Sequence, residues 1–380
     1  MYNNNNNNNK KIKLDFILLI SLSISIFLLS IIFFSIDKEK SIFEISLSQE
    51  IKYTVPLDKI VSGGPPQDGI PSIDSPKFQS VQEADKILED SEFVLGLNIN
   101  GDIRVYPLQI LVWHEIVNDV VGGKPIAVTY CPLCFTNQVF NRTLIDSNIV
   151  EFGTSGKLYN SNLVMYDRKS NSLWSQALAE GIVGDYSGIK LEKIPFDIAY
   201  WKEWKKLYPE SKVLSRDTGS VRPYGADPYG NYYTNDLILF PLANDDKRLG
   251  LKEIVIGLED ENQYKAYKLQ DIETNKVIND VIGEDKKIAL VSLQPFMVRV
   301  FDRGIDDNVN AEGKKTIVDL FYNETNNTLI DRVTDSELNF DGKFINGQLQ
   351  DKQLKRLAMD QGFWFEWTAF HPETEVFSIK

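Results

Sequence analysis

The sequence carries an internal repeat, and this repeat restricts the possible fold more than any other feature. Three pairs of blocks match in the same order along the chain: Tyr106-x-Leu-Gln with Tyr267-x-Leu-Gln, Asn118-Asp-Val-Val-Gly with Asn279-Asp-Val-Ile-Gly, and Trp201-x-Glu-Trp with Trp364-x-Glu-Trp. Several blocks that keep one order and nearly one offset indicate a duplicated structural unit. We therefore predict two tandem copies of one unit, residues 61–252 and 253–380, packed together.

Each copy is expected to be rich in β-strands. Short apolar runs bounded by turn residues predict strands at 93–99, 103–106, 125–130, 135–141 and 163–166. A helical pattern appears near 108–115 and again at 198–208. The predicted fold class is α+β, with more strand than helix.

The N-terminal segment predicts a membrane anchor. Residues 16–36 form an uncharged run of mostly Phe, Ile, Leu and Ser, which as a helix spans a hydrocarbon core of about 30 Å. Lysines precede the run and acidic residues follow it, so the N-terminus is expected in the cytoplasm. Residues 1–15 are then a disordered cytoplasmic tip, 37–60 a stem, and the folded part is extracytoplasmic. A cleaved signal peptide is the less favoured alternative, because no Ala-x-Ala pair follows the run.

The net charge and the number of cysteines exclude some classes of protein. The formal net charge is −13 over 380 residues, and no concentrated basic segment is visible, so no nucleic-acid partner is expected. The chain has two Cys, too few for a disulfide scaffold. Whatever the pair does must therefore be local.

The reactive side chains fall in the first copy. Cys131-Pro-Leu-Cys134 ends an apolar run and permits a disulfide, a redox cycle or a two-thiolate metal clamp. A strand rather than a helix is expected after it, which argues against a thioredoxin-like motif. His114, with Glu115 as orienter, could deprotonate a thiol or supply a third metal ligand. The second copy has other residues at both motifs, so we expect it to be structural or to form one wall of a shared cleft.

Longer motifs resemble a known family. Trp113-His-Glu-Ile-Val-Asn-Asp, Thr129-Tyr-Cys-Pro-Leu-Cys and Phe152-Gly-x-Ser-Gly-x-Leu-Tyr-Asn-Ser are similar to the family called domain of unknown function 3179. Two further segments that begin at Gly63 and Tyr224 resemble it as well, and the similarity extends from Gly63 to about Gly257. The resemblance implies no agreed function. Some members are named as possible selenoproteins, which favours redox chemistry.

One residue departs from the family pattern. Members usually have Gly after the second Cys, where this chain has Phe135. We therefore expect a tighter or less exposed turn at this point.

The leading interpretation is a thiol-redox site with Cys131, Cys134, His114 and Glu115 as catalytic residues. The first alternative is a non-catalytic module that binds copper or zinc through Cys131, Cys134 and His114. The second is a surface interaction protein in which the two Cys form a structural disulfide. The expected partners are the membrane, through residues 16–36, and a redox partner protein or a small-molecule ligand. A supporting cleft is predicted from Asn118, Asp119, Tyr130, Ser155, Tyr159, Asn160, Asp167, Arg168, Trp174 and Gln176.

Overall fold

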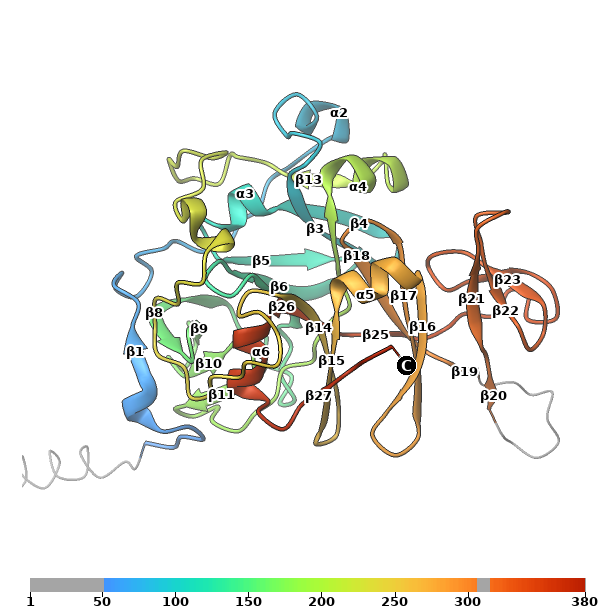
Figure 1. The fold of residues 1–380 in the computed structure, drawn as a ribbon. Helices are drawn as coiled ribbons and strands as arrows, with labels where there is room; N and C mark the ends of the chain where they lie inside the picture. The colour runs from blue at the N-terminus through green and yellow to red at the C-terminus, as the bar shows by residue number, and fades with distance from the viewer. Residues whose placement is uncertain (1–50, 306–314, 380) are drawn as a thin grey trace, which may run out of the picture. The chain divides into compact units, whose positions relative to one another are not determined.

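A computed structural model describes residues 51–305 and 315–379, which form a β-rich fold of several sheets with short helices (Figure 1). By its internal contacts, Tyr53–Lys380 is one unit of the chain. The predicted tip and anchor, residues 1–36, lie outside the described residues. Within residues 51–305 and 315–379, none of the helices has the length and apolar character needed to cross a bilayer.

The first half of this unit, residues 53–252, holds the site residues predicted from the sequence. Its elements in chain order are η1 Leu57–Lys59, β1 Ile60–Ser62, β2 Phe78–Gln79, α2 Val81–Ala84, β3 Phe93–Ile99, β4 Asp102–Pro107, α3 Leu108–Leu111, β5 Ile116–Val121, β6 Lys124–Cys131, β7 Thr136–Asn141, β8 Phe152–Tyr159, β9 Asn162–Asp167, β10 Leu173–Ser175, β11 Glu180–Val183, β12 Asp197–Tyr200, α4 Trp201–Leu207, β13 Lys212–Leu214 and η2 Gly230–Thr234.

The second half, residues 253–379, follows a similar order. Its elements are β14 Ile254–Asp260, β15 Gln263–Lys268, α5 Leu269–Asn275, β16 Val277–Ile282, β17 Lys286–Gln294, β18 Met297–Asp302, β19 Gly304–Ile305, β20 Thr316–Ile317, β21 Leu320–Asn323, β22 Thr328–Asp331, β23 Ser336–Leu338, β24 Phe344–Asn346, β25 Arg356–Leu357, β26 Asp360–Phe363, α6 Trp364–Phe370 and β27 Glu375–Val376.

The order of elements in the first half recurs in the second. The series β3-β4-α3-β5-β6-β7 has the same types of element as β14-β15-α5-β16-β17-β18, and β12-α4-β13 has the same types as β26-α6-β27. Between these series, each half contains consecutive antiparallel strands, β8 to β11 in one and β21 to β24 in the other. The matched sequence blocks therefore lie on elements of the same kind.

Side-chain contacts recur as well. The Tyr106 hydroxyl donates to Asp119 at 2.6 Å, and the Tyr267 hydroxyl donates to Asp280 at 2.9 Å. In each half an asparagine side chain also bonds both backbone groups of the strand-starting residue, Asn118 with Phe152 and Asn279 with Leu320.

In each half a tryptophan of a helix packs on a glycine of a strand, from α4 onto β3 in the first half and from α6 onto β14 in the second. A Cβ at Gly96 would lie 2.0 Å from the Trp204 ring, and one at Gly257 would lie 2.3 Å from the Trp367 ring. Only a residue without a side chain allows this approach, so both glycines are required by packing rather than by a turn.

Strands of the two halves share one sheet. The seven-stranded sheet runs β27-β15-β14-β26-β7-β6-β5, so β26 of the second half lies beside β7 of the first. Arg299 and Arg356 of the second half both form ion pairs with Asp197 of the first, at 2.8 and 2.6 Å. Asp360 in turn pairs with Lys193 of the first half at 2.9 Å. The two halves are thus joined by backbone pairing and by buried charges.

Three local expectations differ from the structure. The helix expected to reach residue 115 ends at Leu111, and Glu115 takes φ 59°, a left-handed conformation that turns the chain into β5. Residues 197–200 are a strand because they pair with β3, and helix α4 begins only at Trp201. The last part of the expected stem packs on the fold, since β1 pairs with β8.

Candidate functional site

The two cysteines lie in the connection between β6 and β7. Cys131 is the last residue of β6 and pairs with Thr136, the first of β7. Both thiols are free and buried, and their sulfur atoms are 2.6 Å apart. The two sulfur atoms are therefore placed to form a disulfide when an oxidant removes two electrons and two protons from the thiols.

Phe135 closes this connection in a backbone conformation that favours glycine. Its φ is 54°, in the left-handed region that costs a residue with a Cβ about 1–2 kcal/mol. The ring offsets this cost by burial among aromatic neighbours, stacking on Phe363 and meeting Phe93 and Phe296 edge-on or nearly so. Phe135 is 8% exposed, so the turn is well covered, as expected from the sequence.

A second hairpin brings polar groups to the sulfur atoms. Asn160 and Ser161 join β8 to β9 with φ of 50° and 64°, the pair of positive values that a two-residue type I′ turn requires. The turn places the Ser161 carbonyl oxygen 3.9 Å from Cys131 Sγ and 3.8 Å from Cys134 Sγ. Asn162, the first residue after the turn, donates from Nδ2 to Cys134 Sγ at 3.2 Å.

The same Asn162 nitrogen reaches two further acceptors. Glu366 Oε1 on α6 lies 3.0 Å away and Gln176 Oε1 lies 3.1 Å away. An amide group has two hydrogens, so it can serve at most two of its three acceptors at once. Burial, and then the charge of Asp360, raise the pKa of Glu366 to about 8. Figure 1 shows α6 of the second half beside β8, β9 and β10 of the first.

Burial also governs the thiols. Burial and the neighbouring Cys131 raise the pKa of the Cys134 thiol well above its usual value, and the charge of Glu366 adds to the shift. Cys134 is therefore protonated at neutral pH when the pair is reduced, and it needs a proton acceptor before it can act as a nucleophile.

Tyrosines of the η2 region cover the cysteine connection. The Tyr232 hydroxyl donates to the Leu133 carbonyl at 2.9 Å. Burial raises the pKa of Tyr229, and the charges of Glu115 and Cys131 raise it further. Glu115 and Cys131 therefore both lie near the Tyr229 phenol. Burial raises the pKa of Glu115 itself to about 8.

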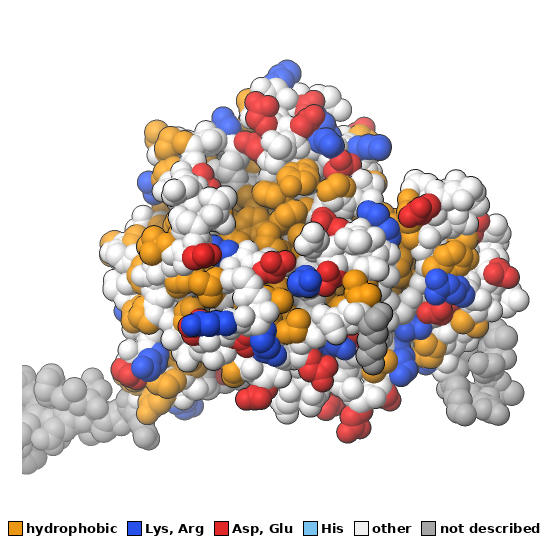
Figure 2. All heavy atoms as spheres, viewed as in Figure 1, with side chains coloured by type: hydrophobic (Ala, Val, Ile, Leu, Met, Phe, Trp, Pro, Cys, Tyr) orange, Lys and Arg blue, Asp and Glu red, His pale blue; other side chains and the backbone are white. Residues whose placement is uncertain are grey.

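A cavity of about 430 Å³ adjoins this cover. Figure 2 shows hydrophobic side chains gathered in a hollow on the face drawn, in the region of β3 and α3 in Figure 1. The lining includes Tyr130 and Phe135, the residues that flank the cysteine connection on either side. Both halves contribute, since the aromatic wall comprises Phe93, Tyr130, Phe135, Tyr233, Phe296 and Phe363.

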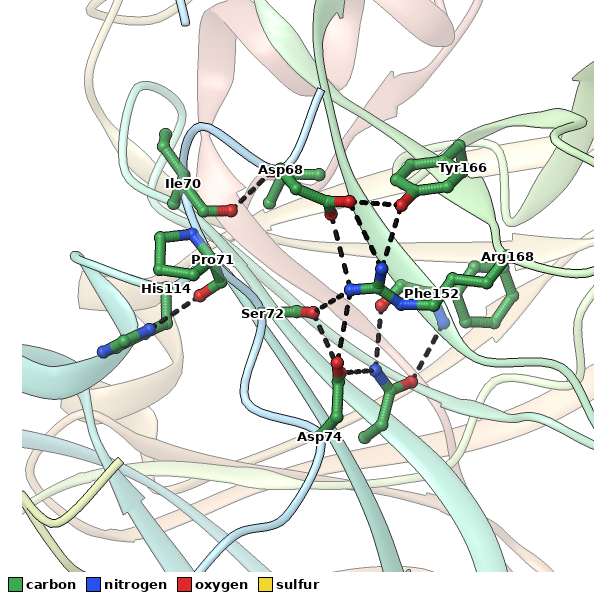
Figure 3. A network of polar contacts seen from close by, with 11 residues as sticks. Asp68, Ile70, Pro71, Ser72, Asp74, His114, Phe152, Tyr166 and Arg168 are labelled. Atoms are coloured by element: carbon green, nitrogen blue, oxygen red, sulfur yellow. Dashed lines mark hydrogen bonds and ion pairs between the residues drawn. The ribbon is translucent and has the colours of Figure 1, made fainter. Parts of the chain in front are cut away.

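His114 is directed to other partners. Its Nδ1 lies 2.7 Å from the Pro71 carbonyl, which only accepts, so Nδ1 carries the proton (Figure 3). Nε2 lies 2.6 Å from the Tyr224 hydroxyl and accepts from it when the ring is neutral. Burial lowers the pKa of His114, as does the charge of Arg222. The lone pair that a general base needs is thus already occupied by Tyr224.

The ligands of the metal alternative are not gathered. Within the part of the chain that the structure describes, no group of three or more His, Cys, Asp and Glu residues lies close enough to hold a metal ion. Cys131, Cys134 and His114 therefore do not form a copper or zinc site in this structure.

Arg168 holds residues 68–74 against the sheet (Figure 3). Its guanidinium contacts Asp68 and Asp74, each at 3.2 Å, and the Ser72 hydroxyl at 2.9 Å. Asn118 adds a bond from its Nδ2 to Asp74 at 2.7 Å. Since Pro71 lies between these anchors, the network also holds the carbonyl that orients His114.

The other residues of the predicted cleft divide into two groups. Gln176 and Tyr130 lie at the thiol site, as described above. The rest hold the fold through contacts of their own: Asp119 with Arg104, Ser155 with the Val164 carbonyl, Tyr159 with the Phe370 ring, Asn160 with the Ala369 carbonyl, and Asp167 with the Trp174 indole.

Several residues of the thiol site were not predicted from the sequence. Asn162 could have been identified from the sequence as the residue that follows a two-residue hairpin turn. Glu366 lies in a block that the repeat comparison identified, but its approach to Cys134 depends on the packing of the two halves. The tyrosines of η2 likewise reach the site only through tertiary structure.

Comparisons with known proteins agree with the motifs. The model of DUF3179, described as a protein of unknown function, matches residues 67–374. This match confirms the resemblance and covers both cysteines, Asn162 and Glu366. No curated protein and no solved structure matches the chain.

Proposed function

The chain belongs to the family of proteins of unknown function DUF3179, and from that premise we propose that Cys131 and Cys134 form a redox-active dithiol of a thiol oxidoreductase. The observation that carries the proposal is the pair of free sulfur atoms 2.6 Å apart. A disulfide that only staples a short turn contributes little stability in the chain-entropy model, about 2 kcal/mol. Redox cycling therefore explains the presence of the two cysteines better than this small gain in stability does.

The surroundings of the sulfur atoms support reversible chemistry. Asn162 donates to Cys134 Sγ at 3.2 Å, a contact that favours a thiolate over a thiol. His114 is not required as the base, because its own contacts are with Pro71 and Tyr224. In this proposal Glu115 stays close to the thiol site, since Glu115 and Cys131 both lie near the Tyr229 phenol.

The cavity of about 430 Å³ is the proposed route for a substrate. Both thiols are at most 2% exposed, so a folded partner protein cannot reach them without movement of the tyrosine cover. A small molecule with an apolar or aromatic body fits a cavity with aromatic walls. Binding beside Tyr130 and Phe135 would bring such a molecule next to the cysteine connection.

We further propose that the two halves are copies of one unit and that only the first keeps the thiol chemistry. The recurring element order, the Tyr–Asp bonds and the glycine–tryptophan contacts support a duplicated unit. The second copy would then serve as a wall, since Phe296 and Phe363 line the cavity.

The proposed location is the outer side of a membrane, with residues 16–36 as the anchor. The uncharged run and its flanking charges carry this proposal. Export would keep the thiols away from cytoplasmic reductants. Protease added to intact cells should digest the folded part and leave the N-terminus protected; protection of the whole chain would contradict this topology.

The redox proposal is tested on the full-length protein in detergent. The protein is equilibrated in buffers of oxidised and reduced glutathione, alkylated, and weighed by mass spectrometry. We expect one two-electron transition that interconverts dithiol and disulfide, and its loss in Cys131→Ser and Cys134→Ser. Thiols that stay reduced in every buffer, or a disulfide that resists strong reductant while the protein is folded, would overturn the proposal.

A further inference from the structure

Glu366 is a carboxyl group of the second half buried beside the thiols of the first. It is 4% exposed on α6. Glu203 holds the corresponding place on α4 and is also buried, but its acidic group pairs with Lys202 at 3.4 Å. The difference between two matched positions suggests that burial at Glu366 serves something other than packing.

The position of Glu366 is set by one shared donor. Asn162 Nδ2 lies 3.0 Å from Glu366 Oε1 and 3.2 Å from Cys134 Sγ. Both acceptors are therefore held around a single nitrogen atom.

On the premise of the proposed dithiol function, we propose that Glu366 is the proton-transfer group of Cys134. It takes the proton of Cys134 when the pair is oxidised and returns it when the disulfide is reduced, while Asn162 positions both. None of the segments that carry the family resemblance contains this residue, and its role follows only from the packing of α6 against the β8–β9 turn.

The step balances with a small disulfide as oxidant. Cys131 first loses its proton to solvent; its thiolate then attacks one sulfur of the small disulfide, forms a mixed disulfide and releases the first small thiolate. Glu366 then removes the proton of Cys134, and the Cys134 thiolate attacks Cys131 Sγ. The intramolecular disulfide forms, the second small thiolate leaves, and the proton rests on Glu366.

A path for that proton toward solvent lies behind Glu366. Asp360 and Lys193 face Glu366 and form an ion pair at 2.9 Å, and Glu259 faces Lys193. Lys193, Asp360 and Glu259 line a second cavity of about 400 Å³. The pKa of Glu366, about 8, lies close to neutral pH, where a group that both accepts and donates a proton works best.

The test follows the two thiolates separately. The reduced full-length protein in detergent is mixed with the aromatic disulfide 5,5′-dithiobis(2-nitrobenzoic acid), which releases a coloured thiolate at each step. The second release reports the attack of Cys134. We expect its rate to rise with pH to a midpoint near 8, following the ionisation of Glu366. In Glu366→Gln this midpoint should vanish, and the second release at pH 8 should slow by roughly 100-fold, a common size for acid–base catalysis.

Matched variants separate proton transfer from structure. Glu203→Gln at the corresponding position should leave the second release unchanged, and Glu366→Asp should keep a pH midpoint at a lower rate. A second release in Glu366→Gln with the wild-type rate and pH profile would overturn the inference while leaving the dithiol intact. No second release in the wild-type protein would instead overturn the proposed function. Unfolding temperatures of all variants identify any that fail to fold. If Glu366→Gln is one of them, the rate and the pH midpoint of the second release in Glu366→Asp decide the inference.

Discussion

Phe135 offers a sharp test of how the cysteine connection is built. Its φ of 54° favours glycine, whereas its ring is buried against several aromatic side chains. Truncation of a buried Phe to Ala costs about 3–5 kcal/mol. Glycine at the same place loses the ring but removes about 1–2 kcal/mol of left-handed strain, which is partly offset by its larger chain entropy.

We therefore expect Phe135→Gly to destabilise the protein by about 2–4 kcal/mol and Phe135→Ala to destabilise it by about 1 kcal/mol more. The order matters more than the sizes, because in extended or helical backbone Ala is the more stable of the two. Urea unfolding of the full-length variants, followed by tryptophan fluorescence, measures both differences.

Phe140 is the matched control. It is fully buried in β7, and its φ is not among the positive ones. There the usual order should return, with Phe140→Ala more stable than Phe140→Gly. An Ala variant at Phe135 that matches or exceeds the Gly variant would refute the strain argument.

Three further predictions concern the fold around the site. Gly96→Ala should destabilise the protein by about 1–3 kcal/mol in urea unfolding, because its Cβ would lie 2.0 Å from the Trp204 ring. Asp197→Asn should cost about 3–5 kcal/mol, because it removes the charge that pairs with the buried Arg299. The pKa of Glu115 is about 8 in the folded protein and about 4.5 in the unfolded chain. The free energy of unfolding should therefore fall as pH rises between these values, by up to about 1.4 kcal/mol per pH unit. Glu115→Gln should remove this part of the decline.

Controls for these variants come from exposed or open positions. Gly250→Ala should be nearly neutral, since the closest atom to its Cβ would lie 3.9 Å away. Asp217→Asn should cost less than about 1 kcal/mol, because Asp217 and Lys77 are both mostly exposed. Equal losses at the control and test positions would refute the packing and ion-pair reasoning, and an unchanged pH slope in Glu115→Gln would refute the burial argument.

Local pattern placed the five expected strands correctly because each carries its own apolar run, whereas the other strands were not predicted. The expected strand at 93–99 has the bounds of β3, and the expected strand at 125–130 lies within β6. The helix expected to reach residue 115 was too long, because residues 112–115 continue its sequence pattern but form a turn that ends in the left-handed backbone of Glu115. Residues 198–200 were expected to be helical because pairing with β3 is not visible in a local pattern.

The site was predictable only in part, for the same reason. The spacing of Cys131 and Cys134 is local and identified the thiol pair. The partners of the thiols are not local: Glu366 reaches Asn162 across more than half of the chain. His114 was the sequence-based candidate for a base, but its ring nitrogens are committed to Pro71 and Tyr224.

The insertion of β26 between β14 and β7 has a consequence for how such a chain can change over time. The second half covers the backbone edge that β7 would otherwise present to other chains. Reactive side chains of the second half can therefore be lost during evolution while the residues that form its strands are retained. Under the proposed duplication, the second half is still required although it lacks the two cysteines, because its loss would leave the first half with an open, aggregation-prone edge.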